Sequence, residues 1–127
     1  MFENIKIKNL QSLYITSKNI LKKEKYFIKY YDELKDEIIC FVDNNENIKI
    51  YSSICPHFGG EIYYDNKNNW LRCKWHDWKF CKDTGKCLSY PIKLELNPYD
   101  FEVKPEKLKN YDVKLESDKI YLIYEKE

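Results

Sequence analysis

Residues 55–76, CPHFGGEIYYDNKNNWLRCKWH, contain both histidines of the chain, two of its five cysteines and two of its three glycines. Cys55 and His57 form a CxH pair, and after fifteen intervening residues Cys73 and His76 form a CxxH pair. Side chains two or three residues apart in a tight loop can point to one centre, so a fold that joins these pairs must bring two loops face to face. Thiolate and imidazole ligands suit zinc, copper, or iron with sulfide, and they do not suit calcium or magnesium.

Short β-strands separated by turns are expected in the first half of the chain. IICFV (38–42) and IKIYS (48–52) flank the turn DNNEN (43–47), and isoleucine alternates with polar residues in the second run. This pattern predicts a hairpin. The aromatic run YFIKYY (26–31) predicts another strand, and DELKD (32–36) either connects it to the next strand or forms one helical turn.

Two more hairpins are expected toward the C-terminus. YDVKL (111–115) and KIYLIY (119–124) flank the turn ESD, and KDTGK (82–86) supplies a turn with Gly85 at the position that requires a left-handed residue. Helical periodicity is weak along the chain. Closely spaced short strands predict an all-β fold, either a sandwich or a barrel.

Length and composition limit the class of protein. A chain of 127 residues is ordinary for a single domain, here expected to span residues 1–127. The net charge of +1, with lysines and acids interspersed, predicts no nucleic-acid partner and no membrane partner. Neither a secretory signal nor a transmembrane helix is recognisable, so a reducing cytoplasmic location is expected. An odd number of cysteines argues against a pure disulfide framework.

The two cysteine–histidine segments resemble a known family. CPHFGG and CKWHDWKF look like the two cluster-binding loops of Rieske [2Fe–2S] proteins, and the resemblance is strongest over residues 52–91. It implies an antiparallel β sandwich or barrel with a small cluster-binding subdomain of two loops at about 52–91, and one [2Fe–2S] cluster per chain. By this resemblance Cys55 and Cys73 bind the inner iron, and His57 and His76 bind the outer iron.

The residues around these loops fit the same resemblance. Trp75, Trp78 and Phe80 are expected to shield the cluster from water, and SYP (89–91) looks like a third loop that covers it. In respiratory and photosynthetic Rieske proteins each loop carries a further cysteine, and the pair forms a disulfide. Here the corresponding positions are Gly60 and Trp75, so that disulfide is not expected. The sequence therefore resembles Rieske ferredoxins and the Rieske domains of ring-hydroxylating oxygenases.

An oxygenase of this type also needs a mononuclear iron held by two histidines and a carboxylate. Both histidines of this chain are already assigned to the cluster, so substrate oxidation is expected on another polypeptide. The sequence thus predicts an electron-transfer component, a ferredoxin that passes single electrons from a reductase to a terminal oxygenase. It has no catalytic residues of its own, its contacts with both protein partners are transient, and it is expected to be a monomer.

Several alternatives remain open at this level. A zinc site uses the same ligand types, although the usual CxxC and HxxxH pairings are missing. The chain also fits a redox-sensing or assembly module, served by the N-terminal 20 residues, or a cluster-bearing subunit of an oxygenase complex. Cys40 is expected to be a buried small hydrophobe. Cys81 and Cys87 flank the 82–86 turn and could face each other across a hairpin, with two separate thiols favoured over a disulfide.

Overall fold

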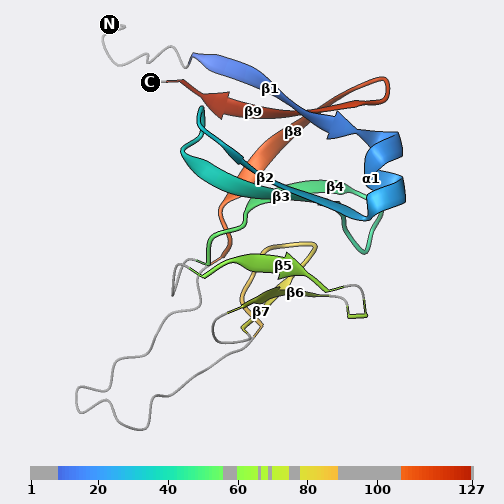
Figure 1. Ribbon diagram of the computed structural model, residues 1–127, viewed down its shortest axis with the longest axis vertical. Helices are drawn as coiled ribbons and strands as arrows, with labels where there is room; N and C mark the ends of the chain where they lie inside the picture. The colour runs from blue at the N-terminus through green and yellow to red at the C-terminus, as the bar shows by residue number, and fades with distance from the viewer. Residues whose placement is uncertain are drawn as a thin grey trace, which may run out of the picture.

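A curled six-stranded antiparallel sheet forms the larger part of the fold. The computed structural model describes residues 9–55, 60–65, 67–68, 70–74, 78–88 and 107–126. The sheet order is β1 (Leu10–Ser17), β9 (Lys119–Glu125), β8 (Asn110–Glu116), β4 (Ile48–Ser52), β3 (Asp36–Val42) and β2 (Tyr26–Tyr31). A short helix, α1 (Lys18–Glu24), connects the two edge strands β1 and β2, as Figure 1 shows. The all-β prediction is confirmed.

The hairpin predicted over residues 38–52 is present. In the β3–β4 register Cys40 lies opposite Ile50, and the turn is held by Asp43, whose Oδ1 accepts the N–H groups of Asn45 and Asn47, each at 2.9 Å. Strand β3 is buried over Ile38, Ile39, Cys40 and Phe41, in agreement with its continuous run of apolar residues. Cys40 is fully buried, as expected, and this burial raises the pKa of its thiol to about 12.

The C-terminal hairpin is also present, and the segment left open at 32–36 is now resolved. Strands β8 and β9 pair from Asp112 opposite Ile123 to Glu116 opposite Lys119. The 32–35 segment is a turn that closes β2 onto β3, with the Leu34 N–H donating to the Tyr31 carbonyl at 3.1 Å. The segment therefore connects the two strands, which was the first of the two alternatives, and it does not form a helical turn.

The N-terminal region is more regular than the sequence suggested. Strand β1 pairs with β9, from Leu10 opposite Glu125 to Ser17 opposite Lys119. Helix α1 follows at once, because the Ser17 side chain caps it by accepting the Ile20 N–H at 3.1 Å, and Leu21 anchors it with 1% exposure. Residues 10–20 are thus part of the larger sheet and of the connection between its two edge strands.

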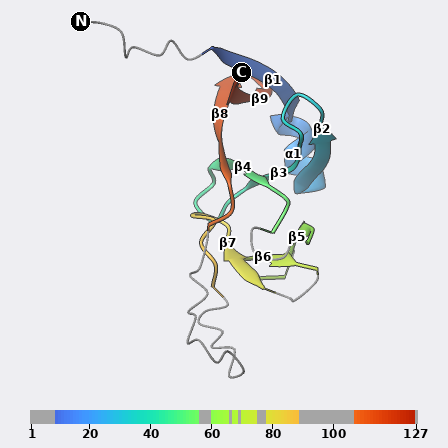
Figure 2. The ribbon, with the colours of Figure 1, turned by 90° about the vertical axis from the view of Figure 1, so that its left-hand side faces the viewer.

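A second, three-stranded antiparallel sheet lies at one end of the molecule, away from α1 (Figures 1 and 2). Its order is β5 (Ile62–Tyr64), β6 (Trp70–Cys73) and β7 (Lys79–Cys81). One hydrophobic cluster joins the two sheets and takes residues from β3 and β4 as well as from all three strands of the smaller sheet. It comprises Ile39, Phe41, Tyr51, Cys55, Ile62, Leu71, Cys73, Trp78, Phe80, Cys87 and Leu108.

The 82–86 turn attaches the smaller sheet to the larger one. The Tyr51 hydroxyl donates to the Lys82 carbonyl at 3.0 Å, and the Leu108 N–H donates to the Gly85 carbonyl at 2.9 Å. Gly85 has φ of 75°, which confirms the predicted left-handed position. A Cβ at this residue would lie 3.3 Å from Cε1 of Tyr51, so both its conformation and its surroundings favour glycine.

Gly85→Ala is therefore expected to lower the free energy of unfolding by about 1 to 2 kcal/mol, because an L side chain in the left-handed region meets the following carbonyl oxygen. Chemical denaturation measures the change. Lys86→Ala is the matched control, since Lys86 is exposed in the same turn and does not have positive φ. Equal stability of the two variants would show that neither the backbone conformation nor the contact with Tyr51 constrains this position.

Candidate metal centre

Cys55 lies at the start of the first predicted loop and is almost fully buried, with 1% exposure. The segment before it pairs with the segment after the loop through an antiparallel bridge between Ile54 and Glu61. The Cys55 N–H donates to the Gly60 carbonyl at 2.7 Å, so the two ends of the first predicted loop are held together. The thiol is thereby held at the base of this loop, in the hydrophobic cluster between the sheets.

Cys73 occupies the equivalent place in the second loop. It is the last residue of β6, it lies opposite Ile62 of β5, and it has 0% exposure. Its N–H donates to the Trp78 carbonyl at 2.8 Å, so the two ends of the second predicted loop are also held together. The two cysteines therefore share one arrangement, in which the cysteine N–H donates to the carbonyl of the residue five positions later.

The two loops leave the sheet at the same end. The Lys74 N–H donates to the Glu61 carbonyl at 2.9 Å, and Glu61 in turn pairs with Ile54, so the three chain segments run side by side at the loop bases. Both cysteine side chains belong to one buried cluster. The structure thus brings together the two cysteines that sequence analysis assigned to a common centre.

His57 and His76 lie outside the described residues, as do Trp75 and residues 89–91. In the sequence, His57 comes two residues after the buried Cys55, and His76 comes three residues after the buried Cys73. Within the described segments no three His, Cys, Asp or Glu side chains gather as a metal site, and only the cysteine half of the predicted ligand set falls there.

The described surroundings fit an iron–sulfur group. Trp78 and Phe80 are buried in the same cluster as the two cysteines, in agreement with the shielding role expected of them. None of the five cysteines is joined in a disulfide, and Gly60 is a buried residue at the base of the first loop. Two buried sulfurs surrounded by apolar side chains suit soft-ligand metal chemistry and exclude water from that side.

Cys81 and Cys87 do not face each other. The bridge beyond the 82–86 turn places Phe80 opposite Cys87, and both residues are buried on the inner side of the sheet. Because side chains alternate along a strand, Cys81 lies on the outer side, where it is half-buried. The expectation that Cys81 and Cys87 could lie opposite each other was wrong, because the residue opposite Cys87 is Phe80, one position before Cys81. The preference for two separate thiols agrees with the structure.

Lys82 supports this region in a way that the sequence did not indicate. Its Nζ donates to the carbonyls of Asp65 and Asn68, both at 3.0 Å, and lies 4.0 Å from the centre of the Tyr64 ring. The residue is only 4% exposed, and burial lowers the pKa of its amine. One buried cation thus ties the β5–β6 connection to the 82–86 turn. In the sequence it is one of many lysines, and only its position in a glycine turn distinguishes it.

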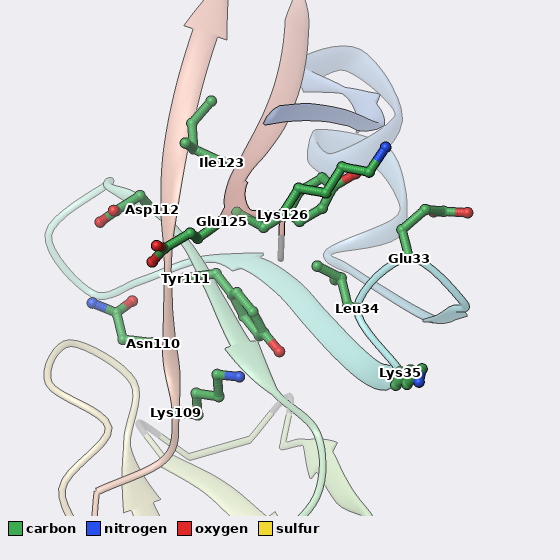
Figure 3. A pocket seen from close by; sticks show the side chains of 11 residues that line it. Glu33, Leu34, Lys35, Lys109, Asn110, Tyr111, Asp112, Ile123, Glu125 and Lys126 are labelled. Atoms are coloured by element: carbon green, nitrogen blue, oxygen red, sulfur yellow. The ribbon is translucent and has the colours of Figure 1, made fainter. Parts of the chain in front are cut away.

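A separate hollow lies away from the two cysteines. It has a volume of about 770 Å³ and lies between the 33–35 turn, β8 and the end of β9, where Tyr111 and Leu34 line it (Figure 3). The Tyr111 hydroxyl donates to Oδ2 of Asp36 at 2.5 Å. No cysteine lines this hollow, so among the described residues the metal-binding chemistry is at the two loops and not in this cavity.

Comparison with known proteins supports this placement. Residues 13–100 match the model of the Rieske [2Fe-2S] domain family. The cytochrome b6-f complex iron-sulfur subunit of Chlorobaculum tepidum is 28% identical over 76 residues, which cover 60% of this chain and 41% of that protein. The chain therefore spans less than half the length of this relative.

Two solved structures resemble nearly the whole chain. The plasma membrane Rieske protein of Synechocystis PCC 6803 has a TM-score of 0.67 and 17% identity, with 87% of this chain and 97% of that one covered. The ferredoxin of carbazole 1,9a-dioxygenase from Nocardioides aromaticivorans has a TM-score of 0.61 and 18% identity, with 87% and 95% covered. Identities this low establish the fold alone. In the described part of the chain no helix is long and apolar enough to cross a membrane.

Proposed function

Because this chain belongs to the Rieske [2Fe–2S] domain family, and so carries one [2Fe–2S] cluster, we propose that it is a ferredoxin that passes single electrons from a reductase to a separate oxygenase. The observation that carries this proposal is that two buried cysteines, each with the same backbone hydrogen bond to a residue five positions later, lie in one cluster beside the smaller sheet. The dioxygenase ferredoxin is covered over 95% of its length by this chain. We further propose that residues 1–127 form a single domain and that the protein works in the cytoplasm.

Cys55 and Cys73 are the proposed ligands of the inner iron, with His57 and His76 on the outer iron. The two buried sulfurs support this assignment, because an apolar environment and backbone closure hold each one in place. When bound, the cluster supplies reversible one-electron chemistry, at a potential raised by its two neutral imidazoles. The apolar side chains around Cys55 and Cys73 exclude water from the cysteine side of the proposed site.

The same count of ligands supports transfer to another polypeptide. The chain has two histidines in all, and both are required by the cluster, so none remains for a mononuclear iron with two histidine ligands. A second candidate function is suggested by the match to a cytochrome b6-f subunit, namely service in a membrane electron-transfer chain. Glycine at position 60 and the lack of any disulfide among the cysteines favour the oxygenase system.

The proposal is tested first on the purified holoprotein. Electron paramagnetic resonance of the dithionite-reduced protein should show the anisotropic signal of a histidine-ligated cluster. Potentiometric titration should place the midpoint near about −150 mV, the low end for such clusters. A Rieske oxygenase and its reductase, assayed without their own ferredoxin, should regain turnover when this protein is added.

Three results would contradict the proposal separately. Colourless protein with bound zinc and no acid-labile sulfide would reject the cluster assignment at these ligands. A midpoint near about +300 mV would favour the membrane-chain candidate. A normal cluster that changes the affinity of a binding partner, without any reductase-dependent transfer, would favour a sensor.

A further inference from the structure

The β5–β6–β7 sheet has two faces of opposite character. Its inner face packs into the hydrophobic cluster, with Ile62, Leu71, Cys73 and Phe80 all at 0% exposure. Alternation along the strands therefore directs the intervening residues outward. Continued through the neighbouring segments by the bridges at both sheet edges, the outer face comprises Ile54, Glu61, Tyr63, Asp65, Trp70, Arg72, Lys74, Lys79, Cys81, Lys86 and Leu88. We call this set the outer face.

Positive charge predominates on the outer face. Among its described residues it carries four basic ones, Arg72, Lys74, Lys79 and Lys86, against two acidic ones, and both acids pair with basic residues of the same face. Glu61 Oε2 lies 3.1 Å from Lys74 Nζ, and Asp65 Oδ2 lies 3.5 Å from Arg72 Nη1. Since the whole chain has a net charge of only +1, this excess of basic over acidic side chains among the described residues is local, and it favours a negatively charged partner on this face.

Aromatic and aliphatic side chains lie among these charges. The Nζ of Lys79 lies 4.9 Å from the centre of the Trp70 ring, and Tyr63 pairs with Arg72 across the β5–β6 register. Ile54 and Leu88 are 41% and 50% exposed at the two edges. Tryptophan, tyrosine and arginine dominate the energetics of protein interfaces, and basic residues at the rim direct the approach of a partner.

The outer face begins at the cysteine loops. Ile54 immediately precedes Cys55, Lys74 immediately follows Cys73, and Lys79 follows Trp78, whose carbonyl closes the second loop. A protein held on this face is therefore adjacent to the proposed cluster. Small electron-transfer interfaces need such proximity and rapid release more than a large buried area.

We propose that the outer face is the docking surface for a redox partner whose matching surface carries carboxylates. This inference rests on the proposed electron-transfer function for its biological meaning, but the surface chemistry can be tested without it. Carboxylates complement the local excess of lysine and arginine, and the aromatic residues provide the apolar centre of a small interface. The partner is thus an acidic protein, recognised beside the cluster loops.

A fluorescently labelled oligoglutamate peptide is the binding probe, and its anisotropy is measured with the holoprotein at low ionic strength. The double variant Lys79→Glu/Lys86→Glu should lose at least about tenfold in affinity, since it removes two attractions and adds two repulsions. Lys22→Glu/Lys23→Glu is the matched control, with the same change in net charge on exposed residues of α1, which lies beside the larger sheet and away from the smaller one (Figure 1). It should change the affinity by less than about twofold.

A redox measurement complements the binding one. The dithionite-reduced protein is oxidised by ferricyanide, an anion that accepts one electron, or by hexaammineruthenium(III), a cation that does the same. The outer-face variant should slow the first reaction and accelerate the second, both by about fivefold at low salt, and the difference should disappear as salt screens the charges. The neutral variant Lys79→Gln/Lys86→Gln should change the logarithm of each oxidation rate by about half as much. Thermal melts check that all variants fold.

Equal peptide affinity of the outer-face and α1 variants would overturn the docking proposal. If the peptide binds as expected but neither redox probe exchanges electrons with the wild-type protein, the electron-transfer function fails and the docking surface stands. If both probes react and the outer-face variant does not alter their rates relative to the control, electrons leave by another face and the proposal is rejected.

Discussion

Cys73→Ser is expected to yield a folded protein that lacks the [2Fe–2S] cluster and does not carry electrons. The side chain is fully buried at the base of the second loop, in the same hydrophobic cluster as the Cys55 side chain. A serine hydroxyl is a harder and less acidic ligand, and soft thiolates are what select iron–sulfur groups. Iron and acid-labile sulfide should fall by at least about tenfold, with loss of the visible absorbance and of the reduced-state resonance signal.

Cys55→Ser should give the same loss, and Cys81→Ser is the matched control. Cys81 lies in β7 of the same small sheet, but its half-buried side chain is on the outer face and not in the cluster of Cys55 and Cys73. Iron content should therefore stay at the wild-type level in this variant. A normal cluster in Cys73→Ser, or an equal loss in Cys81→Ser, would contradict the ligand assignment.

The parts of the fold that were predictable from the sequence depend on local pattern. The β3–β4 hairpin could be placed because a polar turn interrupts two apolar runs, and Asp43 does close that turn. Cys55 and Cys73 could be assigned to one centre because each stands at a fixed short distance from a histidine. Gly85 could be assigned a left-handed conformation because few other residues adopt it readily.

The parts that were missed depend on tertiary context. Helix α1 has seven residues with only Leu21 buried, so it gives almost no apolar periodicity, and its capping by Ser17 is a weak signal by itself. Lys82 is buried although lysine is typically exposed, because two carbonyls and an aromatic ring compensate for its lost hydration. The position of Cys87 depended on a strand register, and a slip of one residue reverses the side on which a side chain lies.

Alkaline pH is expected to unfold the protein steeply, with a midpoint near about pH 11. Burial raises the pKa of Tyr31, Tyr51 and Cys40 to about 12, and burial together with the Asp36 hydrogen bond raises that of Tyr111 further. In the unfolded chain these groups ionise near 10.0 for tyrosine and 9.0 for cysteine. Between the two sets of values the unfolded state binds fewer protons than the folded state, so the free energy of unfolding falls as pH rises.

The expected size of this fall is large relative to the stability of a small domain. Each such group contributes up to about 1.4 kcal/mol per pH unit, or about 6 kcal/mol per unit for the four together, against a typical total of about 5 to 15 kcal/mol. Lys82 acts in the opposite sense, because its lowered pKa makes the free energy of unfolding rise with pH up to 10.5, the ordinary pKa of a lysine amine, but it is one group against four. Circular dichroism and tyrosine absorbance, followed together from pH 8 to 12, would show unfolding and ionisation in one transition.

Tyr31→Phe separates the contribution of burial from other effects of alkali. The variant keeps the ring of a residue that is 8% exposed and removes the hydroxyl, whose ionisation is opposed by burial and by the nearby Cys40, Glu33 and Tyr14. Its transition should be shallower by about a quarter and lie at higher pH. Tyr30→Phe changes the preceding residue of the same strand, which is 55% exposed, and its alkaline unfolding transition should match that of the wild type. If the two variants had identical alkaline profiles, the suppressed ionisation of Tyr31 would not be a cause of the unfolding.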